Sequence, residues 1–224
     1  MEKWKNVNII YEDNHLLVVI KPANMPVCLD SSNDIDLLST LKEYIKIKYH
    51  KPGNVYLGLV HRLDRPVSGI MVFAKTSKAA ERLTKQINSH QFSKTYYAVV
   101  SGKPKQTDTY EDYLIKDDKT NTSYITNKEN GKLSILNYTL IKSVDNLSLV
   151  KINLVTGRHH QIRVQFSSRG YPLYGDHKYN QAFIHNDKTD IALIAKELSF
   201  YHPITKELLH FNIDLPKKYP YTLF

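Results

Sequence analysis

Cysteine is almost absent from this sequence, since Cys28 is the only one among 224 residues. A single thiol excludes an internal disulfide and a cysteine-rich metal site, and we interpret Cys28 as a small apolar filler. The first residues, MEKWKN, also lack the apolar segment of a secretory signal. Because disulfides and signals accompany secreted proteins, their absence predicts a cytoplasmic location.

Long apolar runs and nucleotide motifs are missing as well. No uninterrupted apolar stretch approaches the roughly 18 residues of a membrane span. The sequence has neither G-x-G-x-x-G nor a P-loop, so a nucleotide cofactor would lack its usual phosphate cradle. His159 and His160 could serve a metal, but further ligands at suitable spacing cannot be assembled. We therefore expect no membrane anchor, no cofactor and no metal.

Positive charge is what the sequence has in excess. The hydrophobic fraction of 42% is ordinary for a globular protein, and the length suits one domain over residues 1–224. Lysine and arginine number 31 against 22 acidic residues, which gives a net charge of +9. Such an excess favours a polyanionic partner through phosphate contacts and counterion release. On charge alone, a nucleic-acid partner stands beside the plainer interpretation that the charge serves solubility.

The hydrophobic pattern predicts strands mixed with a few short helices. Helical spacing of apolar residues indicates helices at 35–49 and 159–168, and a third that Ser77 caps. Because no regular βαβ rhythm is visible, the pattern favours an α+β fold over a doubly wound one. The predicted strands are residues 7–11, 16–20, 70–74, 96–100, 133–141, 147–155, 191–200 and 207–213. Turns should join three neighbouring pairs of these strands, at residues 12–15, at 144–146 and around 202–203, and Lys21-Pro22 should end the second strand. The helix at 159–168 should bury Ile162 and Phe166.

The densest group of reactive side chains is the segment HRLDRPVSG at residues 61–69. Neighbouring arginines, Arg62 and Arg65, should keep the carboxyl group of Asp64 ionised. Pro66 and Gly69 indicate a shaped loop between strands, which is where catalytic groups tend to lie. Alone, the segment is equally consistent with a surface ion pair of no consequence.

Two later segments carry further candidates. Residues 156–165, TGRHHQIRVQ, follow a strand and open a helix, and Arg163 stands beside the apolar Ile162, so it could reach inward. Residues 94–98, KTYYA, place two tyrosines in succession in a strand. Successive side chains of a strand face opposite sides, so an inward Tyr96 could stack on a base while Tyr97 faces outward.

These segments together resemble the RluA-type family of RNA pseudouridine synthases. The resemblance runs from about residue 9 to the end, and the matching blocks follow the order of the family. Several short matches in order over one domain are far more specific than any one of them. The blocks are residues 21–22 (KP), 61–75 (HRLD, SG and AK), 94–98 (KTYYA), 156–164 (TGRHHQIRV), 170–176 (G-x-P and GD) and 198–207 (L-x-F-x-H-P-x-T-x-E).

The resemblance implies a mixed, mostly antiparallel sheet with a central catalytic cleft flanked by short helices. It implies isomerisation of a uridine in ribosomal or transfer RNA, without a cofactor, by a monomer. Asp64 would be the catalytic carboxylate, Arg163 its buried counter-ion and Tyr96 the ring that stacks on the uracil. Asp64 would either attack the sugar or act by elimination. The implied substrate-binding residues are His61, Arg62, Arg65, Lys75, Arg158 and Lys178, with Arg65 replacing the flipped-out base and the others mainly contacting phosphates.

Some positions depart from the family pattern. Val67 stands where threonine is usual, Gln165 stands where histidine is usual, and Cys28 occupies a position that is often polar. These departures concern the fit of the substrate rather than the class of reaction. Many relatives carry an N-terminal S4-type RNA-binding domain, and only about eight residues precede the first predicted strand here, so we expect that domain to be absent.

Two other functions stay open at this point. The first is an RNA-binding protein that keeps the fold without catalysis, although Asp64, Tyr96 and Arg163 are all present. The second is a hydrolase, a glycosidase or nuclease, which would need a second carboxylate about 5–10 Å from Asp64. Asp176 is the one partner that the sequence nominates, and it is more typical of a turn cap.

Overall fold

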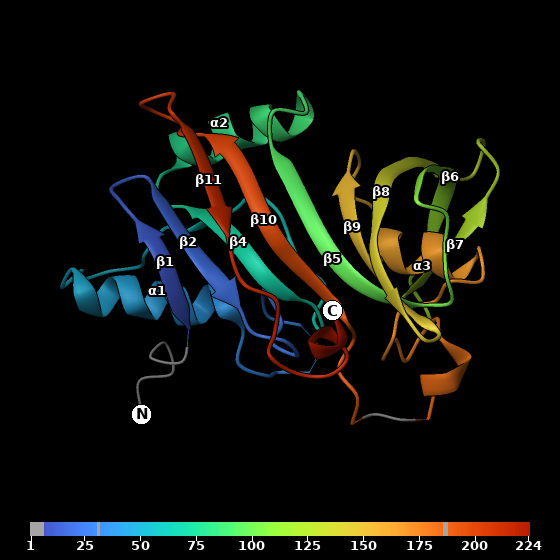
Figure 1. Ribbon diagram of the computed structural model, residues 1–224. Coiled ribbons are helices and arrows are strands. Elements are labelled where there is room, and N and C mark those ends of the chain that lie inside the picture. Colours follow the sequence, from blue (N-terminus) through green and yellow to red (C-terminus); the bar gives the residue numbers. More distant parts are fainter. Residues whose placement is uncertain (1–6, 31, 186–187) are drawn as a thin grey trace. The chain divides into compact units, whose positions relative to one another are not determined.

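The computed structural model describes residues 7–30, 32–185 and 188–224 (Figure 1). The chain forms two compact units, and each draws on two stretches of the sequence. The first unit comprises the described residues up to Ser93 together with Glu197–Ile213, and the second comprises those of Lys94–Lys196 together with Asp214–Phe224. The prediction of one domain over residues 1–224 stays a prediction.

The first unit is built on antiparallel strands. The opening hairpin is confirmed, because β1 and β2 pair antiparallel, and β2 in turn pairs antiparallel with β4. The predicted closing hairpin around residues 202–203 is also confirmed. The strands are β1 (Asn8–Glu12), β2 (Leu16–Lys21), β3 (Gly58–Leu59), β4 (Ser68–Ala74), β10 (Leu193–Tyr201) and β11 (Leu208–Asn212). The first four residues of β10 belong to the second unit.

One face of these strands is covered by helix α2 (Ser77–Asn88). Ala79 and Leu83 of α2 join a core of buried apolar side chains that includes Val18, Val72 and Phe200. The cap of α2 differs from the prediction by one residue: Thr76, not Ser77, accepts the hydrogen bond from the amide of Ala79. Both threonine and serine are preferred at the N-cap of a helix, so the sequence offered two adjacent candidates.

Helix α1 (Leu37–Lys48) begins at Asp36, whose side chain accepts from the amide of Ser39. It lies within the predicted range of 35–49 and buries Leu37, Leu41 and Ile45, which recur at helical spacing. Figure 1 shows α1 crossing β1 and β2, and hydrogen bonds from the end of α1 to Glu12 fix that contact.

The second unit is also an antiparallel sheet, with strand order β5-β9-β8-β6-β7. The β8–β9 hairpin turns at Asp145, whose φ is 52°, as the predicted turn at residues 144–146 requires. The hairpin of β6 and β7 was missed, since its polar sequence lacks a clear alternation. The strands are β5 (Ser93–Ser101), whose first residue belongs to the first unit, β6 (Thr107–Asp117), β7 (Thr122–Thr126), β8 (Lys132–Val144) and β9 (Leu147–Leu154).

Helix α3 (Gln161–Ser167) packs on this second sheet. The ring of Phe166 lies 5.1 Å from that of Tyr110 and 5.2 Å from that of Tyr138, so three aromatic rings seal the helix against β6 and β8. The prediction of a short helix that buries Ile162 and Phe166 is confirmed, but α3 begins two residues later than expected. His160 adopts a left-handed φ of 53°, which delays the helical start.

Helices and antiparallel strands are thus mixed without a βαβ rhythm, and the α+β prediction is confirmed. Short 3₁₀ turns, η2 (Gln181–Phe183) and η3 (Tyr221–Leu223), complete the second unit. Within the described residues, no helix combines the length and the apolar character of a membrane span. In the same part of the chain, no three His, Cys, Asp or Glu side chains gather as a metal site would require.

Candidate active site

Asp64 lies on a fixed loop of the first unit, between β3 and β4. Leu63 and Val67 are 6% and 2% exposed, so the residues around the carboxylate anchor the loop in the core. The amide of Val67 donates to the carbonyl of Asp64 at 3.0 Å, which closes a turn over residues 64–67. Gly69 follows with a φ of 135°, a value that side chains disfavour. Asp64 itself is half-buried.

Lys21 supports this loop from the end of β2. Its side chain is fully buried, and its ammonium donates to the carbonyls of Arg65, Pro22 and Met25 at 2.9, 2.8 and 2.7 Å. Burial lowers the pKa of Lys21 to about 7, while the Asp64 charge opposes that shift. The sequence predicted only that Lys21 ends a strand. A lysine before a proline carries no signal that it reaches the loop 44 residues away.

His61 ties the same loop to β4. Its Nε2 accepts a hydrogen bond from the amide of Val72 at 3.1 Å, and its ring meets that of Phe92 edge-on at 5.3 Å. Since Nε2 accepts, it carries no proton. The imidazole therefore helps to hold the loop. His61 is half-buried, and its predicted contact with the substrate stays a prediction.

The two arginines beside Asp64 are both exposed. Arg65 forms an ion pair with Asp34, another with Asp30 at 3.7 Å, and a hydrogen bond with Ser32 at 3.0 Å. The hydrogen bond from Arg65 lowers the pKa of Asp34. Exposed pairs of this kind contribute at most about 1 kcal/mol, so Arg65 can leave them at small cost.

Lys75, a predicted phosphate contact, lies at the end of β4 with a side chain only 10% exposed. Its ammonium forms an ion pair with Glu12 at 2.8 Å and lies 4.6 Å from the ring centre of Tyr49. The charge of Lys75 is thus largely compensated within the first unit. Lys75 therefore has an evident structural role, and its contact with phosphate stays a prediction.

Arg163 lies in α3 of the second unit and is buried, as predicted. It pairs with Asp176 in a two-pronged contact: Nε to Oδ2 at 2.8 Å and Nη2 to Oδ1 at 2.7 Å. Its guanidinium also lies 5.1 Å from the ring centre of Tyr179. This partnership was missed, because residues 13 apart around a glycine and a proline give no spacing signal.

Asp176 does cap a turn, as predicted. Its Oδ1 accepts from the amides of Lys178 at 3.0 Å and Tyr179 at 3.2 Å. Gly175 precedes it with a φ of 72°, and an added Cβ there would lie 2.2 Å from the carbonyl oxygen of Asp190. Only glycine fits at that position, so the backbone fixes where the Asp176 carboxylate lies.

The sequence alone is consistent with His159 and His160 being exposed polar residues, but His160 is buried and His159 is half-buried. The Nδ1 of His160 lies 2.8 Å from the hydroxyl of Tyr179, and its ring stacks on that of His159 with centres 3.7 Å apart. Burial, with Arg163 nearby, lowers the pKa of His160 to about 2, so this imidazole is neutral.

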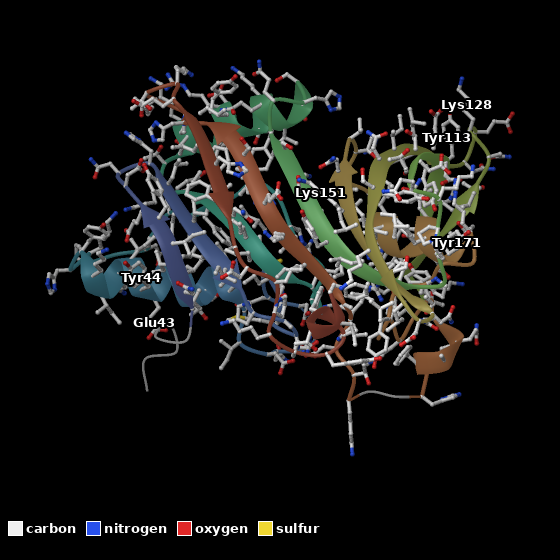
Figure 2. The ribbon with its side chains drawn as sticks, in the orientation of Figure 1. Glu43, Tyr44, Tyr113, Lys128, Lys151 and Tyr171 are labelled. Carbon is white, nitrogen blue, oxygen red and sulfur yellow. The ribbon has the colours of Figure 1, made fainter. Side chains whose placement is uncertain are left out.

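Tyr96 and Tyr97 face opposite sides of β5, as predicted. Tyr96 is 6% exposed and lies opposite Ile152 of β9. Tyr97 is half-buried, with the ammonium groups of Lys196 and Lys151 at 5.3 and 5.9 Å from its ring centre; Figure 2 labels Lys151. Tyr96 is thus the ring on the buried side of this strand.

The remaining predicted phosphate contacts of the second unit are exposed. Arg158 donates from Nε to the carbonyl of Leu133 at 2.9 Å, and Lys178 donates to that of Asn121 at 2.6 Å. Gln165, one of the departures from the family pattern, is fully buried and donates to Asp112 at 2.7 Å, so it serves packing of α3. The predicted grouping of Asp64 with Arg163 and Tyr96 in one site stays a prediction.

The chain matches known proteins over most of its length. The profile of the RNA pseudouridylate synthase family matches residues 15–168, more than half of the chain. The ribosomal large subunit pseudouridine synthase D of Zymomonas mobilis is 34% identical over 94% of this chain and 70% of its own length. The ribosomal large subunit pseudouridine synthase C of Vibrio vulnificus is 31% identical over 92% of this chain and 65% of its own length.

Solved structures share the fold. The human RNA pseudouridylate synthase domain-containing protein 4 superposes with a TM-score of 0.78 at 22% identity, over 94% of this chain and 89% of that one. The human domain-containing protein 1 gives a TM-score of 0.75 at 24% identity, over 95% and 84%. These likenesses support the fold, whereas the family profile also spans Asp64, Tyr96 and Arg163.

Proposed function

We propose that this chain, which belongs to the RluA-type family of RNA pseudouridine synthases and is thus an isomerase, converts a specific uridine of ribosomal RNA to pseudouridine with Asp64 as its catalytic carboxylate. The observation that carries the proposal is the family match over residues 15–168, which includes Asp64 on its anchored loop. Transfer RNA is the alternative substrate, and the relatives named for the ribosomal large subunit favour ribosomal RNA.

The reaction breaks the N1–C1′ bond, rotates the uracil and forms a C5–C1′ bond; C5 loses its proton and N1 gains one. No group is gained or lost, and the redox state is unchanged. Asp64 acts on the sugar, either by attack on C1′ as in retaining glycosidases or within an elimination. A carboxylate that must remain ionised away from water needs a cation, and Arg163 takes that role. Tyr96 stacks on the uracil while it turns.

A uracil inside a helix cannot reach such a carboxylate, so the target base is flipped out at a cost of a few kcal/mol. Arg65 is the residue proposed to fill the vacated space, since its exposed ion pairs with Asp34 and Asp30 break at little cost. The proposed RNA contacts are His61, Arg62, Lys75, Arg158 and Lys178. We propose a cytoplasmic location, with the chain acting as a monomer.

The test is conversion of unmodified transcripts of ribosomal and transfer RNA, mapped with carbodiimide and reverse transcription. Wild-type protein should produce one pseudouridine stop, and Asp64→Asn should abolish it with an unchanged circular dichroism spectrum and melting temperature. Asp118→Asn, which alters an 85% exposed carboxylate, is the matched control and should retain full activity. Substantial conversion by Asp64→Asn would refute the assignment.

The same assay separates the two alternative functions. Binding of RNA without any stop that depends on Asp64 would favour a protein that keeps the fold and has no catalytic activity. Release of free uracil, or cleavage of the transcript, would favour a hydrolase. Asp176 was the nominated second carboxylate for that hydrolase, and its two-pronged contact with Arg163 commits both its oxygens elsewhere.

A further inference from the structure

Two arginines of the second unit are held in the same way, each by an aspartate and a tyrosine ring. Arg163 pairs with Asp176 and lies against Tyr179. Arg169 pairs with Asp112 at 2.9 Å and lies 4.1 Å from the ring centre of Tyr110. The two sets differ in burial: the Arg163 and Asp176 side chains are 5% and 0% exposed, against 29% and 12% for Arg169 and Asp112.

The contact with Asp176 fixes the plane of the Arg163 guanidinium. A guanidinium has five N–H donors, and Asp176 takes one from Nε and one from Nη2. The carboxylate is itself immobile, because its Oδ1 also accepts from the amides of Lys178 and Tyr179. The edge of the guanidinium that Asp176 holds is therefore the one formed by Nε and Nη2.

The ring of Tyr179 is fixed as firmly as the carboxylate. Its hydroxyl accepts from the amide of Ser123 at 2.7 Å. The same hydroxyl forms a second hydrogen bond with Nδ1 of the neutral His160 imidazole at 2.8 Å. With its backbone amide held by Asp176, Tyr179 presents one face to the guanidinium and cannot turn away.

A buried ion pair is a poor source of stability, because removing both charges from water costs about as much as their attraction returns. Asp176 holds one edge of the Arg163 guanidinium and the Tyr179 ring lies against its face. These contacts are better explained by a need to fix the orientation of the guanidinium. We propose that Asp176 and Tyr179 are positioning residues that fix Arg163 in the orientation in which it serves the catalytic carboxylate. This inference rests on the role of Arg163 in the proposed function.

The first test compares Asp176→Asn with Asp112→Asn under single-turnover conditions, on the transcript that the wild type modifies. Asparagine keeps the shape of Asp176 but presents an N–H group to one N–H of Arg163. The maximal rate should fall about 10- to 100-fold, since small misplacements at a reacting centre cost that much. The enzyme concentration at half-maximal rate should change less than about twofold, because RNA binding does not involve Asp176.

Asp112→Asn breaks the matched pair and should lower the melting temperature without lowering the maximal rate. That result separates the loss of any arginine–aspartate pair from the loss of this one. Equal rate losses in the two variants would overturn the proposal, because they would show that general destabilisation reduces the rate.

The second test uses Tyr179 and does not change any charge. Tyr179→Phe removes the hydroxyl and keeps the ring against Arg163, whereas Tyr179→Leu removes the ring. Leucine should lower the maximal rate about tenfold or more, and phenylalanine should restore most of it. Equal losses in both variants, or none in either, would refute a positioning role for the ring.

Arg163→Ala distinguishes failure of this inference from failure of the proposed function. If Arg163→Ala abolishes conversion while Asp176→Asn and Tyr179→Leu retain the wild-type rate, Arg163 is catalytic and the positioning proposal is wrong. If Arg163→Ala itself converts the transcript at the wild-type rate, the proposed role of Arg163 fails, and with it the basis of this inference.

Discussion

A single buried lysine shows how much one side chain can do near the candidate catalytic loop. Lys21 donates to three carbonyls, from Pro22, Met25 and Arg65, so it joins the end of β2 to the residue after Asp64. These carbonyls would lose their donor if Lys21 were replaced, and a buried carbonyl without a donor costs about 1–3 kcal/mol. Lys21 thus fixes the backbone on which Asp64 stands.

We expect Lys21→Met to destabilise the protein by about 2–4 kcal/mol, because methionine fills the space and leaves several carbonyls without a donor. Urea denaturation of both proteins, followed by circular dichroism, measures this difference. Lys103→Met, in an exposed loop position, is the control and should change stability little. A Lys21→Met protein as stable as wild type would show that other donors satisfy those carbonyls.

At the scale of elements, Glu12 connects α1 to the sheet of the first unit. Its carboxylate accepts from Tyr44 at 2.7 Å and Tyr49 at 2.8 Å, and it forms ion pairs with Lys48 at 2.6 Å and Lys75 at 2.8 Å. Figure 2 labels Tyr44 on α1. Burial by itself would raise the pKa of Glu12. Hydrogen bonds from these four groups, of which Lys48 has the largest effect, outweigh burial and lower the pKa to about 2. One carboxylate therefore links the end of β1, the end of α1 and the residue after β4.

This arrangement predicts a defined pH dependence for Glu12→Gln. The unfolded carboxyl group takes up its proton near pH 4.5 and the folded one near pH 2, so the stabilisation by Glu12 is complete above 4.5 and is lost as the pH falls to 2. At pH 7 the variant should lose on the order of 1–3 kcal/mol, and the difference from wild type should vanish near pH 2.

Urea denaturation at a series of pH values measures that difference. Glu81→Gln is the control, since Glu81 pairs with Lys85 on the exposed side of α2 and should matter much less. A difference between wild type and Glu12→Gln that stayed constant from pH 7 to pH 2 would contradict the ionised network.

At the scale of the whole molecule, net charge governs the encounter with RNA. The excess of nine positive charges attracts phosphates from a distance, while the described pairs of Lys48, Lys75, Arg163 and Arg169 are neutralised inside the fold. The residues that remain as exposed candidates for phosphate contact are Arg62, Arg65, Arg158 and Lys178. Fewer cations are therefore available for phosphate contact than the total of 31 lysines and arginines.

We expect RNA affinity to fall about 100-fold between 50 and 200 mM salt, which corresponds to roughly four phosphate contacts with a slope of about −0.9 each. Fluorescence anisotropy of a labelled transcript measures the slope. Arg158→Ala should reduce it by about one contact, whereas Lys85→Ala, which removes a cation paired with Glu81, should leave it unchanged. A flat salt response would show that charge is not the main source of affinity.

Local patterns predicted those parts of the fold that neighbouring residues specify. The hairpins of β1–β2, β8–β9 and β10–β11, and the helices α1 and α3, follow from apolar periodicity and turn residues. The β6–β7 hairpin was missed because its strands alternate weakly, so contacts across the sheet rather than its own pattern decide its structure. The cap of α2 was misplaced by one residue because Thr76 and Ser77 can both accept the same bond.

The sequence by itself determined the family and the α+β class, because short motifs in a fixed order can be recognised without knowledge of their contacts. It also nominated the catalytic side chains, which stay a prediction. Only the tertiary structure decided which groups hold those side chains. Asp176 and Tyr179 lie against Arg163, and Lys21 donates to the carbonyl of Arg65 in the loop of Asp64. Such partners are 13 to 44 residues apart, and no local preference of the backbone encodes a distance of that kind.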